Sequence, residues 1–142
     1  MVPTGVAIWL CLLGAVFIGC STTVSTERNS ADATLRPRMV RGPSSDIFNL
    51  AEHCIRQEFP EGIVRTDELG GDIEVTDYSV MGGDAVLTVT LLGWPDDKVE
   101  VTASAVGLGA DRQKALVGRF LSDFDRAYDE WNKARESNGR VP

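Results

Sequence analysis

The segment VGRFLSDFDRAYDEW, residues 117–131, carries the clearest structural pattern in this chain of 142 residues. Its large apolar side chains recur every three or four positions, so on an α-helix they form one stripe while the charged residues between them face away. The stripe comprises Val117, Phe120, Leu121, Phe124, Tyr128 and Trp131. Asp111 is a suitable N-cap, and we expect the helix to run from there to about Glu136. Such a stripe needs an apolar partner surface.

The segments before this helix predict a sheet as that partner. The candidate strands, which are rich in β-branched residues, are residues 72–80, 85–92 and 98–106. Gly82-Gly83 and Pro95-Asp96-Asp97 separate them as turn signals. In the third candidate strand apolar and polar side chains alternate, which is typical of a sheet with one face in water. An extended segment at residues 62–66, before Gly70-Gly71, adds a further candidate strand.

A second amphipathic helix is expected at residues 45–58, before Pro60. Its apolar stripe comprises Ile47, Leu50, Ala51, Cys54 and Ile55. Residues 45–142 therefore predict one small α+β domain. We expect an antiparallel three- to four-stranded β-meander with one face packed by an N-terminal helix and a long C-terminal helix.

The first 26 residues contain no charged side chain, and Val6 to Cys20 are fifteen uncharged, mostly apolar residues. This composition fits the apolar region of a secretory signal. A helix of that length spans roughly 22 Å, which is shorter than the hydrocarbon core of about 30 Å. We therefore predict a signal peptide at residues 1–19, with an uncleaved signal anchor as the alternative.

Val16-Phe17-Ile18-Gly19-Cys20 resembles a bacterial lipobox, in which a small residue precedes the cysteine that is lipidated and becomes N-terminal. The resemblance implies that Cys20 carries the lipid, including palmitate, and anchors the protein in the cell membrane or outer membrane, facing the periplasm or the exterior. Residues 20–44 then form the lipidated cysteine and a flexible tether, because residues 21–44 are polar and lack apolar periodicity. Ser21 resembles the residue that directs lipoproteins to an outer membrane.

The order α-β-β-β-α behind a lipobox and a tether resembles a family of small bacterial lipoproteins known only as domains of unknown function. The likeness rests on a strand of alternating valines that runs through Val106-Gly107-Leu108-Gly109 into an amphipathic helix. It implies the fold and an envelope location, and it offers no catalytic residues.

Candidate chemical motifs do not combine into a catalytic site. If Cys20 is lipidated, Cys54 remains alone in the domain, on the stripe of its helix. His53, the only histidine, points about 100° away from Cys54 on that helix, so the two do not form a nucleophile and base. Gly107-Leu108-Gly109 has Arg112 where a dinucleotide loop needs its third glycine. We predict no catalytic residue and no cofactor.

Two acidic groups of the sequence are candidate cation sites. On the last helix, the group comprises Asp123, Asp125, Asp129 and Glu130, and its spacing lacks the central glycine of a calcium loop. It fits instead a solvated face with ion pairs four residues apart, Arg119 with Asp123, Arg126 with Glu130 and Asp129 with Lys133. Asp67, Glu68 and Asp72 lie around a double glycine and leave calcium binding as an alternative. No metal site is predicted.

The net charge of the predicted domain bears on the kind of partner that it can bind. Residues 45–142 contain 10 Lys and Arg against 19 Asp and Glu, a net charge of −9 within a chain of −7. Such acidity argues against nucleic acid as a partner.

Our leading hypothesis is a lipid-anchored cell-envelope protein that is a non-catalytic binding or structural module for an envelope protein or the wall. The alternatives are a small-ligand-binding domain, indicated by a cavity, and, less favoured, an enzyme. An exposed patch around Trp94 and Pro95 would indicate a protein partner.

Overall fold

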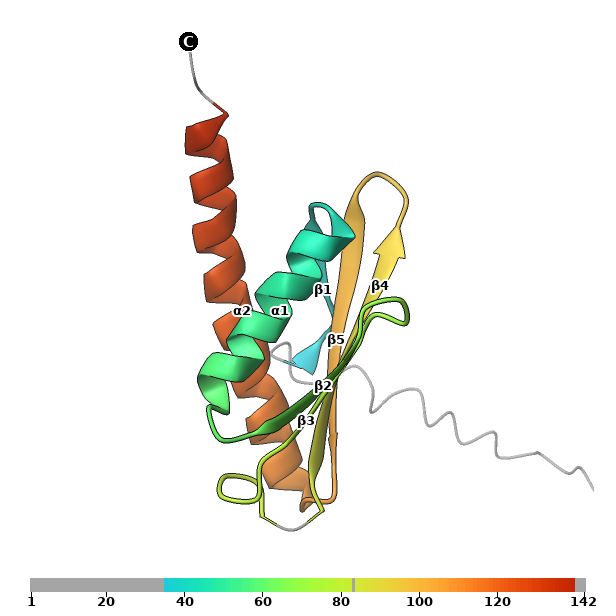
Figure 1. The fold of residues 1–142 in the computed structure, drawn as a ribbon, viewed down its shortest axis with the longest axis vertical. Helices are drawn as coiled ribbons and strands as arrows, with labels where there is room; N and C mark the ends of the chain where they lie inside the picture. Colours follow the sequence, from blue (N-terminus) through green and yellow to red (C-terminus); the bar gives the residue numbers. More distant parts are fainter. Residues whose placement is uncertain (1–34, 83, 140–142) are drawn as a thin grey trace, which may run out of the picture.

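The computed structural model describes residues 35–82 and 84–139 (Figure 1). The elements are β1 (Arg38–Arg41), α1 (Ser44–Glu58), β2 (Ile63–Asp67), β3 (Asp72–Thr76), β4 (Val86–Trp94), β5 (Lys98–Val106) and α2 (Ala110–Asn138). The strands form one antiparallel sheet in the order β1-β5-β4-β3-β2. The predicted signal peptide (residues 1–19), Cys20 and most of the predicted tether lie outside the described residues.

The predicted α+β class and the antiparallel meander are confirmed by strands β2 to β5. The extended segment at residues 62–66 is strand β2, and β5 occupies the residues expected for it. Along β5, Val99 and Val101 are buried, whereas Thr102 and Ser104 are exposed, as the alternation predicts. The meander forms because its connections are short, so consecutive strands pair with each other.

The strand count of three to four was wrong, because the sheet has five strands. The missed strand is β1, which lies within residues 20–44, the segment predicted to be a tether. Val40 of β1 is buried and pairs with Val99, and Gly42 donates a hydrogen bond to the Asp97 carbonyl oxygen at 2.8 Å. A four-residue strand with one buried side chain has no visible period, so its pairing with β5 could not be read from the chain.

Helix α2 forms hydrogen bonds with β1 on the side of the strand away from β5. The Arg38 Nε atom lies 3.0 Å from both carboxylate oxygens of Asp125 on α2. The Tyr128 hydroxyl accepts a hydrogen bond from the Arg41 N–H and donates one to the Arg41 carbonyl oxygen, both at 3.0 Å. These bonds satisfy backbone groups at a sheet edge. Asp125, which was expected on the solvated face of the last helix, is therefore half-buried and pairs with Arg38.

The hairpin predicted at Gly82-Gly83 was also wrong in its bounds, because β3 ends at Thr76 rather than at residue 80. The carboxylate of Asp77 accepts hydrogen bonds from the Ser79 N–H, the Ser79 hydroxyl and the Val80 N–H at 2.6–3.1 Å. The same bonds, the Ser79 hydroxyl first, lower the pKa of Asp77. A side chain that binds the backbone two and three residues ahead favours a turn over a strand. The turn therefore begins directly after β3.

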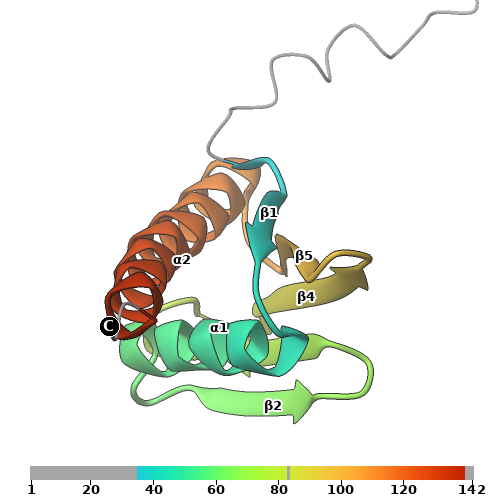
Figure 2. The same cartoon turned by 90° about the horizontal axis from the view of Figure 1, so that it is seen from above.

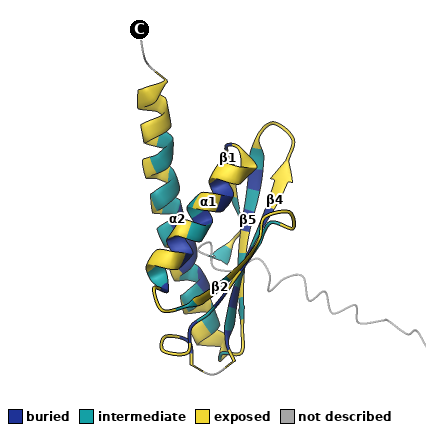
Figure 3. Cartoon of the chain, in the orientation of Figure 1, coloured by how far each residue is buried: buried dark blue, intermediate teal, exposed yellow. Residues whose placement is uncertain are grey.

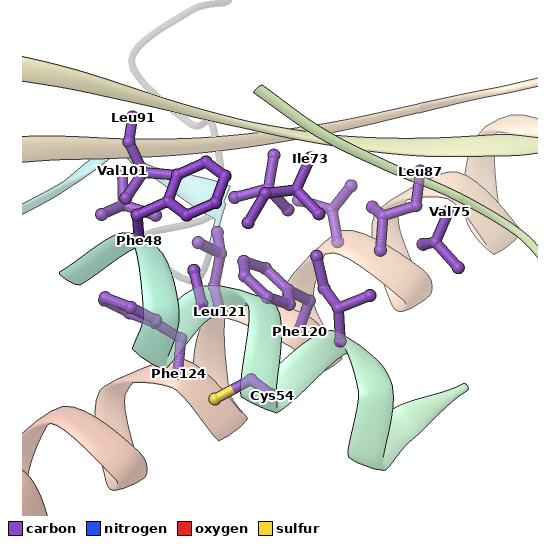
Figure 4. Packing of buried hydrophobic residues seen from close by; sticks show 14 of the residues in the cluster. Phe48, Cys54, Ile73, Val75, Leu87, Leu91, Val101, Phe120, Leu121 and Phe124 are labelled. Atoms are coloured by element: carbon purple, nitrogen blue, oxygen red, sulfur yellow. The ribbon is translucent and has the colours of Figure 1, made fainter. Parts of the chain in front are cut away.

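Both helices lie on one side of the sheet, and the sheet curves around α1 (Figure 2). The facing surfaces of the two layers are buried, and the opposite face of the sheet is largely exposed or half-buried (Figure 3). The core consists of inward residues of β3, β4 and β5 and the stripes of both helices (Figure 4). Its most deeply buried aromatic residues are Phe59, Phe120 and Phe124.

The stripe predicted for α2 is confirmed. Val117, Phe120, Leu121 and Phe124 are buried, and Tyr128 and Trp131 pack half-buried against the core. The expected N-cap was wrong, because Gly109 precedes the helix and Asp111 lies in its first turn. A carboxylate there still interacts favourably with the helix dipole. Neither α1 nor α2, the helices of the described part, is long and apolar enough to cross a membrane.

Candidate functional site

The predicted lipidation site, Cys20, lies outside the described residues and stays a prediction. The other cysteine considered for chemistry, Cys54, is buried in the core with 5% of its surface exposed, as the stripe of α1 predicts. Burial, with a smaller contribution from the negative charge of Asp123, raises the pKa of Cys54 to about 11. Cys54 is therefore a neutral thiol at physiological pH. His53, the neighbouring residue, is exposed.

The acidic residues of α2 form contacts that differ from those expected. Arg119 pairs with Glu58 of α1 rather than with Asp123. Arg126 pairs with Asp123, three residues before it, at 3.0 Å, rather than with Glu130. The reason is the packing of α1 against α2, which brings the end of α1 within reach of Arg119. These carboxylates therefore lie where the two helices meet.

The second acidic group, around the Gly70-Gly71 turn, has local structural roles. Asp67 accepts a hydrogen bond from the Gly70 N–H at 3.0 Å, and Asp72 accepts one from the Thr90 hydroxyl at 2.7 Å. Within residues 35–82 and 84–139, no group of three His, Cys, Asp or Glu side chains is arranged to hold a metal ion. The calcium alternative at this turn therefore gains no support from the geometry.

A groove of about 540 Å³ opens between the two helices. We call it the α1–α2 groove; it is lined by Leu50, His53, Cys54, Gln57 and Glu58 of α1 and by Asp123, Arg126, Ala127, Glu130 and Trp131 of α2. Its volume lies within the range of small-molecule sites, about 300–1,000 Å³. This groove lies between the helices; a further hollow of about 440 Å³ lies between the start of α1, the Gly70-Gly71 turn and strands β4 and β5.

Two residues that line the α1–α2 groove, Cys54 and Glu58, have raised pKa values. Burial raises the pKa of Glu58; the positive charge of Arg119 opposes this shift, and the negative charge of Asp123 adds to it. The raised pKa of Cys54 also has burial as its largest cause and Asp123 as the next. Shifted ionisable groups that converge in a groove are a recognised feature of binding sites, although packing alone also produces them.

A second candidate surface lies on the face of the sheet away from the helices. We call it the Trp94 patch; it consists of Met39, Leu92, Trp94, Pro95 and Lys98. The side chains of Met39, Leu92 and Trp94 are 54%, 53% and 49% exposed. Residues of this patch and Asp96 line a shallow hollow of about 400 Å³. Large apolar side chains that gather on an exposed surface are typical of interaction sites.

Strand pairing explains how the Trp94 patch forms. Glu100 of β5 lies between Met39 of β1 and Leu92 of β4, and Lys98 lies beside Trp94. The tight turn after Trp94 holds Asp96 and Asp97 at φ values of 64° and 53°, which non-glycine residues rarely adopt. Farther along the same face, exposed or half-buried polar residues such as Thr90 and Thr102 follow. These polar residues separate the Trp94 patch from the exposed Val106 and the half-buried Val86, which lie at the other end of the same face.

The sequence predicts part of the Trp94 patch but not the α1–α2 groove. Trp94 and Pro95 are the part that the sequence predicts, whereas Met39 falls in the segment predicted to be a tether. The available signal was a methionine and a valine between two arginines, residues 38–41, which is too short to identify a strand. The α1–α2 groove was missed because it depends on how closely the two helices approach, which no local pattern reports.

Comparisons of the chain with family models, with curated proteins and with solved structures found no match. The protein is therefore classified by its architecture alone. The described domain has two layers, an antiparallel five-stranded sheet with helices α1 and α2 on one face.

Proposed function

We propose that this chain is a lipid-anchored cell-envelope protein whose domain is a non-catalytic binding module for another envelope protein. The observation that carries the binding role is the Trp94 patch, on a sheet face that no described element covers. A tryptophan half exposed beside other large apolar residues is costly to keep in water and is enriched at protein interfaces. The lipid anchor is supported by the resemblance of residues 16–20 to a lipobox.

The acidity of the domain fits a protein partner better than nucleic acid or an anionic membrane surface. Charges of both signs surround the patch, Lys98 and its β1 neighbour Arg41 against Asp96, Asp97 and Glu100. The net charge of −9 of residues 45–142 disfavours anionic phosphates as the partner. The patch therefore mixes large apolar side chains with charged neighbours, and a protein partner can contact both kinds of group.

The test is site-specific photo-cross-linking in intact cells that express the full-length chain. A photoreactive phenylalanine analogue would replace Trp94 or, as a matched control, Tyr78, an aromatic residue that is 63% exposed in the β3–β4 connection. We expect a discrete protein adduct from position 94 that is absent from position 78. Adding Leu92→Asp to the position 94 variant should reduce this adduct, because it places a charge on the same face of β4, two residues before position 94. Identical adducts from both positions would contradict the proposal.

A second candidate function, binding of a small ligand, is favoured by a separate observation. The α1–α2 groove has the volume of a small-molecule site and combines apolar residues with convergent carboxylates. It lies in the helical layer, whereas the Trp94 patch lies on the opposite side of the sheet. The two candidate functions can therefore be tested independently.

A further inference from the structure

Two carboxylates of the α1–α2 groove, those of Glu58 and Asp123, are less exposed than the arginines with which they pair. The side chains of Glu58 and Asp123 are 13% and 31% exposed, whereas those of their partners Arg119 and Arg126 are 61% and 73% exposed. The arginine head groups therefore lie mostly in solvent, where an ion pair contributes little. A positively charged group that entered the groove would meet the carboxylates in a less hydrated setting than the arginines do.

The balance of charge in the groove is negative. Three carboxylates, those of Glu58, Asp123 and Glu130, contribute to its lining, against the guanidinium of Arg126, and Arg119 pairs with Glu58 from outside the lining, so the carboxylates exceed the guanidinium groups by one. The raised pKa of Glu58 is consistent with this balance, since Arg119 offsets burial and Asp123 only in part. An anionic ligand would be repelled, and a neutral one would leave the carboxylates without a new partner.

The apolar part of the groove suits an organic cation better than a bare metal ion. Leu50, Ala127 and Trp131 contribute apolar surface. The indole of Trp131 already interacts with a cation, because the Arg135 guanidinium lies 4.5 Å from the ring centroid. Aromatic rings attract cations through the negative potential of their faces. The same residue can therefore contact the body of a cationic ligand while the carboxylates contact its charge.

We infer that the α1–α2 groove binds a small organic cation, an ammonium or guanidinium group carried on an apolar body. The charged group pairs with Glu58 and Asp123, and the apolar body packs against Leu50 and Trp131. This inference rests on the second candidate function, ligand binding, and is independent of the Trp94 patch.

The test compares two probes of nearly equal shape, the 2-phenylethylammonium ion and neutral 2-phenylethanol, in titrations of the full chain in a non-ionic detergent. The NMR signal of the Trp131 indole N–H reports on the groove, and that of Trp94 is the internal control. We expect the ammonium ion to shift the Trp131 signal and leave the Trp94 signal in place. The alcohol should bind at least about fivefold more weakly, which corresponds to about 1 kcal/mol.

Matched variants separate the charge from the shape of the groove. Glu58→Gln and Asp123→Asn preserve side-chain volume, and each should weaken ammonium binding about five- to tenfold. Asp129→Asn, at an exposed position of α2 outside the groove lining, should leave it unchanged. If the alcohol binds as tightly as the ammonium ion, the inference is overturned while ligand binding stands. If neither probe moves the Trp131 signal at millimolar concentration, both the inference and the second candidate function are overturned.

Discussion

Cys54 and Glu58 lie four residues apart on α1, and both line the groove that faces α2. The pKa of each side chain is raised, with burial as the largest cause and Asp123 as a further one. A single environment thus keeps the thiol neutral and disfavours the charged form of the carboxyl group. Asp77 shows the opposite effect, since its pKa is lowered by the hydrogen bonds that its carboxylate accepts in the β3–β4 connection.

We expect Glu58→Gln to make the protein more stable than the parent at pH 7. The folded pKa of Glu58 lies above its ordinary value of 4.5, so folding favours the protonated form, which glutamine imitates. The stabilisation from protonation is fully present below about pH 4.5 and is lost as the pH rises through the folded pKa. The ion pair with Arg119 that the substitution removes contributes at most about 1 kcal/mol.

The measurement is urea unfolding of parent and variant between pH 3 and pH 8. The difference between the two curves isolates Glu58, because Asp77 and all other groups are common to both. The stability difference should shrink towards zero as the pH falls below about 4.5. A variant that is less stable than the parent at pH 7 would show that the Arg119 contact outweighs burial.

Among the elements, β1 and α2 depend on each other for their positions. β1 pairs with β5 along one edge, while Arg38 and Arg41 of β1 contact Asp125 and Tyr128 of α2. Helix α2 in turn packs its stripe against the sheet and α1. A strand of four residues without a partner beyond its own edge would be marginal. The contacts with α2 explain why it forms.

A fragment that begins at residue 45 should therefore be less stable than one that begins at residue 35. The shorter fragment lacks Val40, which is 7% exposed, and leaves the edge of β5 and the carboxylate of Asp125 without their partners. We expect a loss of at least about 2 kcal/mol, mainly from the buried side chain and the lost hydrogen bonds. Equal urea midpoints for the two fragments would show that β1 does not contribute to the stability of the domain.

Phe124→Ala should be among the most destabilising substitutions in α2. Phe124 is fully buried and its ring lies between those of Phe120 and Tyr128, with centroids 6.2 and 6.3 Å away. We expect a loss of about 3–5 kcal/mol. A domain of this size is stable by only about 5–15 kcal/mol, so much of that stability would be lost.

The control for Phe124→Ala is Asp129→Ala, because Asp129 is exposed, whereas Asp125 pairs with Arg38. The control should change stability by no more than about 0.5 kcal/mol. Both would be measured by urea unfolding of the fragment from residue 35. An unchanged midpoint for Phe124→Ala would mean that the stripe is a docking surface rather than core.

For the molecule as a whole, the two candidate surfaces lie on opposite layers of the described domain. The helical layer presents the α1–α2 groove, and the far side of the sheet presents the Trp94 patch. An anchored protein with both could bind a partner through the sheet and a ligand through the helices. Their separation on opposite layers makes it possible to disable either one without disturbing the other.

The proposed anchoring has its own test. Cys20→Ser should block cleavage between Gly19 and Cys20 and abolish labelling by a radioactive fatty acid in growing cells, because an acyl chain of this kind is attached to the cysteine. Each buried methylene contributes about 0.8 kcal/mol, so loss of the chains should also release the domain from membranes unless the uncleaved signal retains it. Cys54→Ser is the matched control and should keep the label. Labelling that persists in Cys20→Ser would rule out this residue.

The parts of the fold predicted correctly are those with a period along contiguous residues. The stripes at residues 47–55 and 117–131 and the alternation at residues 98–106 each repeat within one element, because the helix and the strand impose their own spacing on buried side chains. Those patterns were sufficient for the two helices, the meander and the burial of Cys54. The end of β3 could not be predicted, because residues 72–80 have the composition of one continuous strand. The hydrogen bonds that Asp77 accepts from Ser79 and Val80 end the strand at Thr76.

The features that could not be predicted join residues that are far apart in the chain. Arg38 and Asp125, and likewise Arg41 and Tyr128, are separated by 87 positions. The Trp94 patch combines β1 with β4 and β5, and the α1–α2 groove exists only where the first and last helices approach each other. Local periodicity specifies which side of an element is buried. Contact between elements instead depends on how residues far apart in the chain come together. β1 and both candidate surfaces therefore form only when the helices and the sheet pack against each other.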